Sequence, residues 1–212
     1  MRSLHGQSST EQCQWAQFLQ QRAGYMGAGE FLVELLKSRN DPRLTIYFTS
    51  AQDADTVRGA PPGVGDTKAS TLNPAYLAAD DASIDLLSFE ENNLIIAECQ
   101  YYAGNEAEAL AALNDVRTAL ESKWGLDAGT YPALTGLTGE DLLHAILEEK
   151  YISLFLNIEV WNDYKRNCYP ELVPYGGVKI PGRILYSDAE VQANRNVPAD
   201  PLRNDNDPNV CP

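Results

Sequence analysis

Residues 148–170 read EEKYISLFLNIEVWNDYKRNCYP, and this stretch decides the fold because it combines a helical pattern with the densest group of aromatic residues. Apolar residues recur at helical spacing over 146–155, and the pattern breaks at Asn157. A second, shorter helix can begin near Ile158. The stretch therefore predicts a helical hairpin whose aromatic side chains lie in the core.

The second helix of this hairpin carries Trp161, Tyr164 and Lys165 at positions i, i+3 and i+4. Residues at this spacing share one face of a helix, so we expect Trp161 to be buried in the core. Pro170 ends the helix, because proline cannot continue it.

The composition is that of a globular protein with a strongly acidic surface. The chain has 212 residues, 44% of them hydrophobic, a formal net charge of -14 and a pI near 4.4. This length is enough for one domain with a real core. The charge repels phosphate backbones and anionic lipid head groups, so nucleic acid is a poor candidate partner. No apolar run approaches the roughly 18 residues that span a membrane.

The segment 13–48 is predicted to be a helical segment followed by a turn, with helix over 13–39 that is interrupted at Gly24, Gly27 and Gly29. The Asn-Asp-Pro sequence at 40–42 predicts a turn, and 44–48 is compatible with a short strand. The segment 49–87 is predicted to be a long loop because glycine and proline cluster in it. Its Gly-Val-Gly-Asp-Thr-Lys run at 63–68 lacks the spacing of a phosphate loop.

The segment 88–168 is predicted to hold two helix pairs, 88–124 and 138–168. Ser88 is a good N-cap for the first helix, and Gly104 and Asn105 separate it from an alanine-rich helix over 106–123. This helix–turn–helix arrangement resembles a tetratricopeptide unit. After a loop at 125–137, Thr138 can cap the next helix.

The tail, 169–212, is too rich in proline for regular helix or central sheet. We expect it to run as an extended wrap over the helices. The predicted fold class is thus mostly α, with tetratricopeptide-like helix pairs wrapped by an irregular, proline-rich tail.

The chain offers few groups for catalysis or metal binding. His144 and Glu148 form at most half of a metal site, and the adjacent pair Glu148–Glu149 is expected to be a solvated face rather than paired catalytic carboxylates. The acidic run at 205–209 lacks the glycine and the final glutamate of a calcium loop. Cys99 lies on an apolar helix face and is expected to be a buried free thiol, whereas the state of Cys13 is open. We predict no catalytic residue, no metal and no cofactor.

Sugar binding would use aromatic platforms near element ends and loops. Trp124, Tyr131, Tyr175 and Tyr186 occupy such positions and are the candidate ligand contacts.

Three sequence blocks, in order, resemble the SusD/RagB family of nutrient-binding outer-membrane lipoproteins. The blocks are Asn-Asp-Pro-Arg-Leu at 40–44, the stretch from Lys150 to Tyr169-Pro170 that includes Trp-Asn-Asp-Tyr, and Ile-Pro-Gly-Arg-Ile-Leu-Tyr at 180–186. The resemblance covers residues 13–212 and corresponds to the C-terminal half of a typical member. It implies structural roles for the residues at its motif positions, which are Asp41, Pro42, Arg43, Trp161, Asp163 and Arg166.

The resemblance also implies a function. Members bind an oligosaccharide or peptide at the cell surface and cap a SusC-like TonB-dependent outer-membrane transporter, without catalysing a reaction. The exported setting is oxidising, so we predict a disulfide between Cys168 and Cys211. Residues 1–14 do not read as a signal peptide, and Cys13 lacks the context of a lipoprotein cysteine. We therefore expect the chain to be a piece of a longer exported protein.

Two other functions remain open at this stage. The first is a stand-alone helical-repeat adaptor that binds a protein segment. The second, a glycan-active enzyme, is weakened by the lack of a convincing acid/base pair. The ligand itself cannot be named from the sequence.

Overall fold

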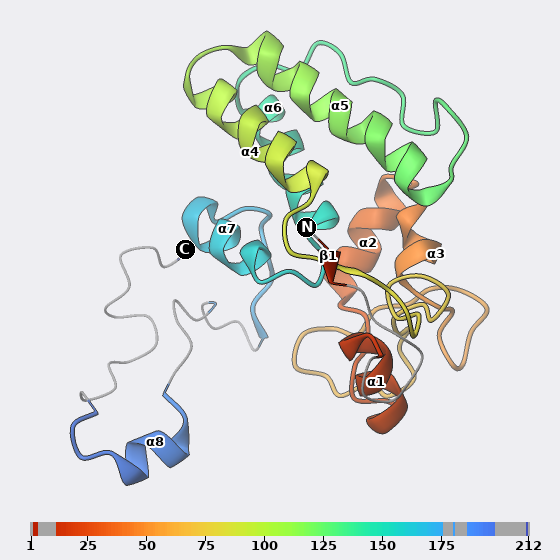
Figure 1. Cartoon of the computed structure of the whole chain (residues 1–212), viewed down its shortest axis with the longest axis vertical. Coiled ribbons are helices and arrows are strands. Elements are labelled where there is room, and N and C mark those ends of the chain that lie inside the picture. The colour runs from red at the N-terminus through yellow and green to blue at the C-terminus, as the bar shows by residue number, and fades with distance from the viewer. Residues whose placement is uncertain (1, 4–11, 176–179, 181–185, 198–210, 212) are drawn as a thin grey trace. The chain divides into compact units, whose positions relative to one another are not determined.

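The computed structural model describes residues 2–3, 12–175, 180, 186–197 and 211. As expected, the described part is mostly helical, with very little strand (Figure 1). The chain divides into two compact units, Met1–Ser153 and Leu154–Pro212, and each is described by itself.

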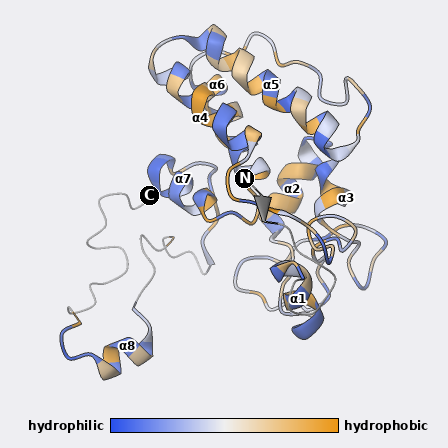
Figure 2. Ribbon diagram, viewed as in Figure 1, coloured by the Kyte–Doolittle hydropathy of each residue, from blue (hydrophilic) through white to orange (hydrophobic). Residues whose placement is uncertain are grey.

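Three short helices follow β1 (Arg2–Ser3) in the first unit. They are α1 (Gln14–Gln21), α2 (Glu30–Ser38) and α3 (Arg43–Tyr47). The glycine-rich interruption between α1 and α2 lies where the sequence predicts it. The suggested strand over 44–48 is wrong, because the chain turns into α3 directly after Pro42. The helix α2 is among the most hydrophobic segments of the molecule (Figure 2), and it buries Leu32, Val33 and Leu36.

The long loop between α3 and α4 is irregular, as predicted, yet its backbone is fixed at several points. Phe48 forms an isolated bridge with Leu72, and Gly29 forms one with Ala60. At Gly59 an added Cβ would lie 2.4 Å from the Cα of Glu30, so only glycine fits this close approach. The loop ends at β2 (Ile84–Asp85), which pairs antiparallel with β1 (Arg2–Ser3).

The core of the first unit lies between α4 (Phe89–Tyr102), α5 (Glu106–Trp124) and α6 (Gly139–Ser153). The helices α4 and α5 run side by side as a hairpin, and α6 packs against both (Figure 1). Small buried residues in this contact allow the helices to approach closely. The buried core residues are Leu94, Ala97, Ala109, Ala112, Leu113, Val116, Leu120, Tyr131, Leu142 and Ile146.

The face that α4 buries differs from the one that its apolar residues predict. The helix buries Leu94, Ala97 and Glu98, whereas Ile95, Ile96 and Cys99 point outward. Cys99 is outside any disulfide, but it is exposed, so the prediction of a buried thiol is wrong. The physical reason is that Glu98 turns inward to meet Lys150 of α6, with 3.2 Å between Oε2 and Nζ. Cys13, in contrast, is buried.

The second unit contains α7 (Glu159–Asn167) and α8 (Asp188–Ala193). The break at Asn157 and a helix start next to Ile158 are confirmed. The predicted disulfide between Cys168 and Cys211 is also confirmed, with 5.2 Å between the Cα atoms. The prediction that the tail holds no regular helix is wrong for α8, where Ser187 accepts a hydrogen bond from the Glu190 amide as an N-cap.

In α7 the buried aromatic residue is Tyr164, and Trp161 is only partly buried, with its ring centroid 6.4 Å from that of Tyr164. The expectation that Trp161 belongs to the buried core is therefore wrong. The helix is short and rich in polar residues, and Tyr164 is the residue of α7 that is buried. Asp163 and Arg166 form an i, i+3 ion pair at 2.6 Å, on the partly exposed side of the helix.

Some predictions fall on residues that the structure does not describe. They are most of the 180–186 block, the acidic run at 205–209, and the wrap of the tail over the helices.

Candidate functional site

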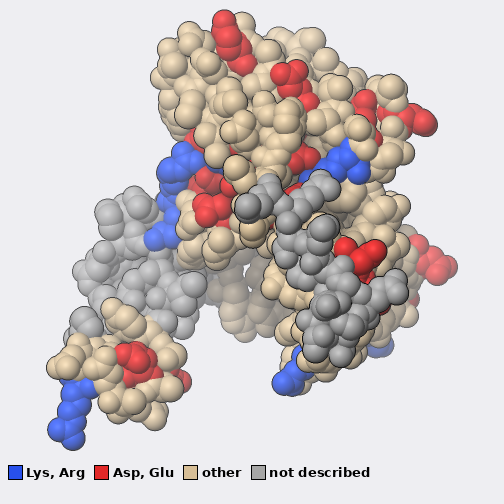
Figure 3. Space-filling view, in the orientation of Figure 1, with Lys and Arg blue, Asp and Glu red and all other residues tan. Residues whose placement is uncertain are grey.

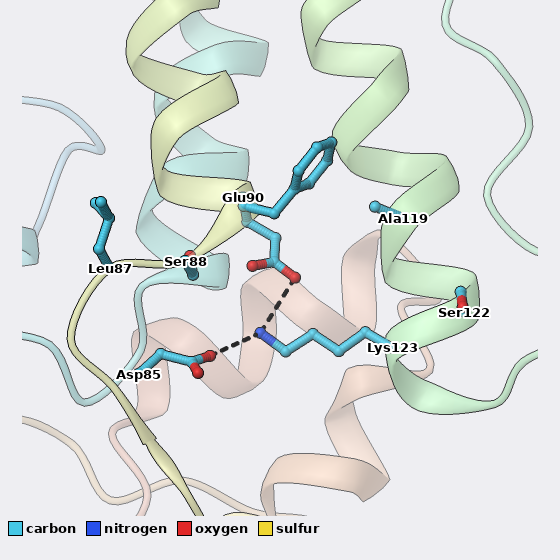
Figure 4. A pocket seen from close by; sticks show the side chains of 8 residues that line it. Asp85, Leu87, Ser88, Glu90, Ala119, Ser122 and Lys123 are labelled. Carbon is cyan, nitrogen blue, oxygen red and sulfur yellow. Dashed lines mark hydrogen bonds and ion pairs between the residues drawn. The ribbon is translucent and has the colours of Figure 1, made fainter. Parts of the chain in front are cut away.

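A surface pocket opens where the chain enters α4, next to the last two turns of α5. Its volume is about 470 Å³. The residues that line it are Asp85, Leu87, Ser88, Phe89, Glu90, Ala119, Ser122 and Lys123 (Figure 4). Within the part of the chain that the structure describes, this pocket combines a cavity of ligand size with exposed apolar and charged side chains.

The α4–α5 hairpin creates the pocket. The two helices run in opposite directions, so the start of α4 lies beside the end of α5 (Figure 1). The Ser88 hydroxyl accepts a hydrogen bond from the Glu91 amide at 3.0 Å and fixes the first turn of α4. Ala119 and Ser122 are small, so the wall contributed by α5 leaves room for a ligand.

A shared ion pair closes one side of the pocket. The Lys123 ammonium lies 3.4 Å from Oδ2 of Asp85 and 3.1 Å from Oε1 of Glu90. Figure 4 shows both interactions converging on the same nitrogen. The ammonium also lies 5.5 Å from the centroid of the Trp124 ring, a cation–π distance. These contacts hold a charged, hydrogen-bonding surface in place before any ligand arrives.

The other side of the pocket is apolar and exposed. Phe89 is 55% exposed and Leu87 is 56% exposed. Leu86, directly before them in the chain, is 63% exposed, so three apolar side chains of one short segment remain at the surface, and such a group is typical of a binding surface. The pocket thus offers one aromatic ring together with carboxylate, hydroxyl and ammonium groups.

A second charged cluster lies deeper in the same unit and is closed to ligands. Its centre is Arg43, whose side chain is fully buried. The guanidinium lies 2.6 Å from Oδ2 of Asp41 and 2.7 Å from Oε1 of Glu149. Arg39 adds a contact to Glu149 at 2.9 Å, and Tyr131 donates its hydroxyl to Asp41 at 2.8 Å. We call these five residues the Arg43 cluster.

The Arg43 cluster corrects the sequence prediction for Glu148–Glu149. Glu149 is fully buried rather than part of a solvated face, because it faces Arg43 and Arg39. Burial alone raises the pKa of Glu149, but the charges of the two arginines outweigh burial and lower it. Burial likewise raises the pKa of Asp41, and the hydrogen bonds and charge of Arg43 lower it below its ordinary value. Both groups therefore act as buried carboxylates that hold the fold together.

The predicted ligand residues are distributed over several places. Trp124 follows Lys123 at the end of α5, and its ring meets those of Tyr47 and Tyr76 edge-on, at 6.0 and 6.3 Å. Tyr131 is buried, with the guanidiniums of Arg43 and Arg117 within 5.5 Å of its ring centroid, which leaves little of the ring for a ligand.

Tyr175 and Tyr186 belong to the second unit. Tyr175 is 68% exposed and Tyr186 is 41% exposed. Both rings remain candidates for ligand contact from that unit.

Sequence reasoning missed the pocket residues as a group. The sequence identifies Ser88 as an N-cap, and it does not point to Asp85, Phe89, Glu90 or Lys123 as ligand contacts. The one available signal is the run Leu86-Leu87-Ser88-Phe89, in which apolar residues directly precede and follow an N-cap. In the structure Leu86, Leu87 and Phe89 of this run are all more than half exposed.

Among the described residues, no group of three or more histidine, cysteine, aspartate and glutamate side chains is placed to hold a metal ion. Likewise, none of the described helices is long and apolar enough to cross a bilayer.

Comparison with known proteins gives a family and a fold. Residues 4–187 match the model of a SusD-like family that is described as starch-binding and associating with the outer membrane. A solved structure titled chitin-binding protein is similar in fold, with a TM-score of 0.62 and 20% sequence identity. The match covers 89% of this chain and 51% of that one, so the chain spans about half the length of the solved relative. No curated protein matches the chain.

Proposed function

Since the chain belongs to the SusD-like family, we propose that it is part of a non-catalytic, glycan-binding protein of the cell surface. We propose further that the pocket at the start of α4 contacts the glycan. The observation that carries this proposal is the exposed Phe89 ring beside a preformed cluster of hydrogen-bonding side chains.

The chemistry of the pocket suits a sugar. A sugar ring has an apolar face and a rim of hydroxyl groups, so it needs a flat apolar partner and polar groups at the edge. Phe89 supplies the apolar face. The carboxylates of Asp85 and Glu90 can accept hydrogen bonds, and the hydroxyls of Ser88 and Ser122 can both donate and accept them.

The pocket is less suited to glycoside hydrolysis. That reaction uses two carboxyl groups, one of which must be protonated to act as the general acid. Here the two carboxylates of the pocket, Asp85 and Glu90, both lie within 3.4 Å of the same ammonium, that of Lys123, so both are engaged in one ion-pair group on one side of the pocket. Binding without catalysis is the function that the geometry supports.

The partner that we propose is a SusC-like TonB-dependent transporter. The family description of association with the outer membrane supports this proposal, and so does the exposed apolar side of α4. Ile95, Ile96 and Tyr102 are 43%, 41% and 62% exposed on that helix, which suits contact with a protein. The full-length protein, tagged and purified from its native membrane, should bring down a transporter barrel in near-stoichiometric amount. Repeated purification without a barrel would reject the partner.

The exposed side chains of Ile95, Ile96 and Tyr102 also favour a second candidate function, that of an adaptor that binds a protein segment. The glycan-binding protein and the adaptor differ in the molecule that contacts Phe89. Identifying the ligand therefore distinguishes the two functions, whereas identifying a protein partner does not. A glycan array that includes chitin oligosaccharides tests the first candidate, with a short-peptide array in parallel for the second.

The decisive comparison uses the full-length protein and two variants of α4. Phe89→Ala should weaken glycan binding about tenfold, equivalent to about 1.4 kcal/mol, in isothermal titration calorimetry. Ile95→Ala removes an exposed apolar residue from the same helix but outside the pocket, and it should leave glycan affinity unchanged. If both variants bind glycans like the original protein, the pocket is not the contact site. If peptides bind and glycans do not, the proposed glycan-binding function is wrong and the adaptor function is supported.

A further inference from the structure

We propose that a second pocket, beside the end of α1, binds a small uncharged molecule that has an apolar body and an amide or hydroxyl group. We call it the α1 pocket. It shares no lining residue with the pocket at the start of α4. The inference therefore concerns a site of its own and does not depend on the proposed glycan binding.

The walls of the α1 pocket are held in place by backbone hydrogen bonds. They come from the end of α1, the connection between α1 and α2, and two parts of the long loop after α3 (Figure 1). The Ala28 amide donates to the Ser70 carbonyl at 2.7 Å and joins the connection to the loop. The Gln52 amide donates to the Lys68 carbonyl at 2.9 Å and joins the two parts of the loop. Because these bonds exist without a ligand, the pocket is preformed.

The size and lining of the α1 pocket suit a compact apolar molecule. Its volume is about 320 Å³. Since a cavity of about 150 Å³ can hold a benzene ring, this one has room for roughly ten to twelve non-hydrogen atoms. None of the described residues that line it is aromatic, so it lacks the flat platform that a sugar ring needs. Its larger apolar lining residues are Leu19, Met26, Leu72 and Pro74.

The charges at the wall of the α1 pocket are balanced. Asp66 is its ionisable lining residue, and its two carboxylate oxygens accept hydrogen bonds from the Arg58 guanidinium and, at 2.9 Å, from the Lys68 amide. Arg58 also pairs with Asp53 at 2.9 Å, and this hydrogen bond, together with the charge of Lys68, lowers the pKa of Asp53. Two carboxylates are thus accompanied by two cations, so a charged ligand would lose its hydration without gaining a free partner.

This local balance is compatible with the acidity of the whole chain. The formal net charge is -14. On the face drawn in Figure 3, uncharged areas separate the charged side chains of the described residues. The total charge therefore does not decide which ligand a single pocket takes.

The polar groups of the α1 pocket are hydroxyls and amides. Gln52 and Thr67 line it and are exposed, and the Gln52 amide can both donate and accept hydrogen bonds. The Thr71 hydroxyl in the wall is buried, and no group in the described part of the chain forms a hydrogen bond with it. A threonine side chain has more than one staggered position, so this hydroxyl can turn to an amide or hydroxyl group of a ligand. Such a ligand would supply the hydrogen bond that the fold leaves unmade.

The test uses N-cyclohexylacetamide, a neutral probe with an apolar ring and one amide. Saturation-transfer NMR with the full-length protein measures its affinity and shows which of its protons contact the protein. We expect a Kd of about 1–10 mM, ordinary for a probe of about ten non-hydrogen atoms, with the ring protons most strongly saturated. Cyclohexanecarboxylate and cyclohexylammonium keep the ring but carry a charge, so each should bind at least about tenfold more weakly.

Two variants locate the site. Ala23 is exposed and lines the pocket, so Ala23→Phe fills it and should weaken binding of the probe at least about tenfold. Thr71→Val keeps the shape of the side chain and should weaken binding by about threefold, with an unchanged melting temperature, because its hydroxyl has no partner in the fold. Ala107→Phe makes the first change at an exposed position of α5 outside the pocket, and this matched control should bind the probe like the original protein.

The outcomes are distinct from those of the glycan experiments. The inference is wrong if the probe does not bind, if its charged analogues bind equally well, or if Ala23→Phe and Ala107→Phe have the same affinity. Thermal melting shows whether Ala23→Phe is folded, and if it is not, an unchanged affinity of Thr71→Val overturns the inference by itself. Each of these results leaves glycan binding at Phe89 as it stands, because that function is measured with other ligands and other variants.

Discussion

Two adjacent glutamates of α6 give a sharp test of the Arg43 cluster. Glu149→Gln keeps the shape of the side chain and removes its charge, leaving Arg43 with Asp41 as its carboxylate partner. Glu148→Gln makes the same change one residue earlier, where the side chain is 28% exposed and lies 3.2 Å from Arg39. The two variants thus differ in burial and partners rather than in chemistry.

The expected magnitudes follow from that burial. Breaking a buried, hydrogen-bonded ion pair on one side typically costs about 3–5 kcal/mol, because the remaining charge stays buried without compensation. Since the amide oxygen of the substituted side chain could still accept one hydrogen bond, we expect Glu149→Gln to lower the free energy of unfolding by about 3 kcal/mol, the low end of that range. The Arg39–Glu148 pair is partly buried, with side chains 22% and 28% exposed, so water screens it more than it screens the Glu149 pair, and Glu148→Gln should cost only about 1 kcal/mol.

The pH dependence of stability provides an independent signature. Arg43 and Arg39 lower the pKa of Glu149 below its ordinary value of 4.5, against the effect of burial. A lowered pKa in the folded state means that stabilisation is complete above the ordinary value and is lost as the pH falls through the folded-state value. The original protein should therefore lose stability below about pH 4.5, and Glu149→Gln should lose less over the same range.

Urea unfolding followed by circular dichroism at pH 7 and at pH 4 measures both effects. The reasoning is refuted if Glu149→Gln and Glu148→Gln have equal stability at pH 7, or if the two variants keep identical pH dependence. Either result would mean that water reaches Glu149 and that the cluster is not a buried one.

Three further predictions concern other parts of the chain. Replacing Cys168 and Cys211 by serine should destabilise the second unit by about 4 kcal/mol in the chain-entropy model, for a sequence separation of 43; peptide mapping without reductant should find the linked pair, and two alkylated thiols would disprove it. Ser88→Ala should cost about 1 kcal/mol through loss of the N-cap of α4, measured by thermal melting, and an unchanged melting temperature would contradict that role. Trp161→Ala should cost about 1–2 kcal/mol, short of the roughly 3–5 kcal/mol of a fully buried tryptophan, and a larger loss would restore the core role that the sequence indicated.

Local signals in the sequence located most of the helices. Ser88 predicts the start of α4 because a serine hydroxyl satisfies a backbone amide there, and the structure shows this bond. Gly104, with a φ of +82°, ends the same helix in a conformation that other residues rarely adopt. In both cases the interaction lies within a few residues, so the chain segment itself determines it.

The interactions that the sequence could not reveal join distant residues. Arg43 and Glu149 are 106 positions apart, and nothing near Glu149 distinguishes it from Glu148. The orientation of α4 depended on a similar contact, since Glu98 and Lys150 are 52 positions apart. Apolar periodicity alone placed Cys99 inside, whereas the buried ion pair set the rotation of the helix.

The pocket and the Arg43 cluster show why residue types alone cannot separate a scaffold from a site. In each of them, two carboxylates form ion pairs with one cation. Asp41 and Glu149 pair with Arg43, and Asp85 and Glu90 pair with Lys123. The side chain of Arg43 is fully buried, so its charge can interact only with the protein and contributes to the fold. Lys123 and Asp85 keep 23% and 27% of their side chains exposed beside a cavity, so the same ionic chemistry can meet a ligand. Burial, which only the assembled fold determines, is what assigns these two charge clusters their different roles.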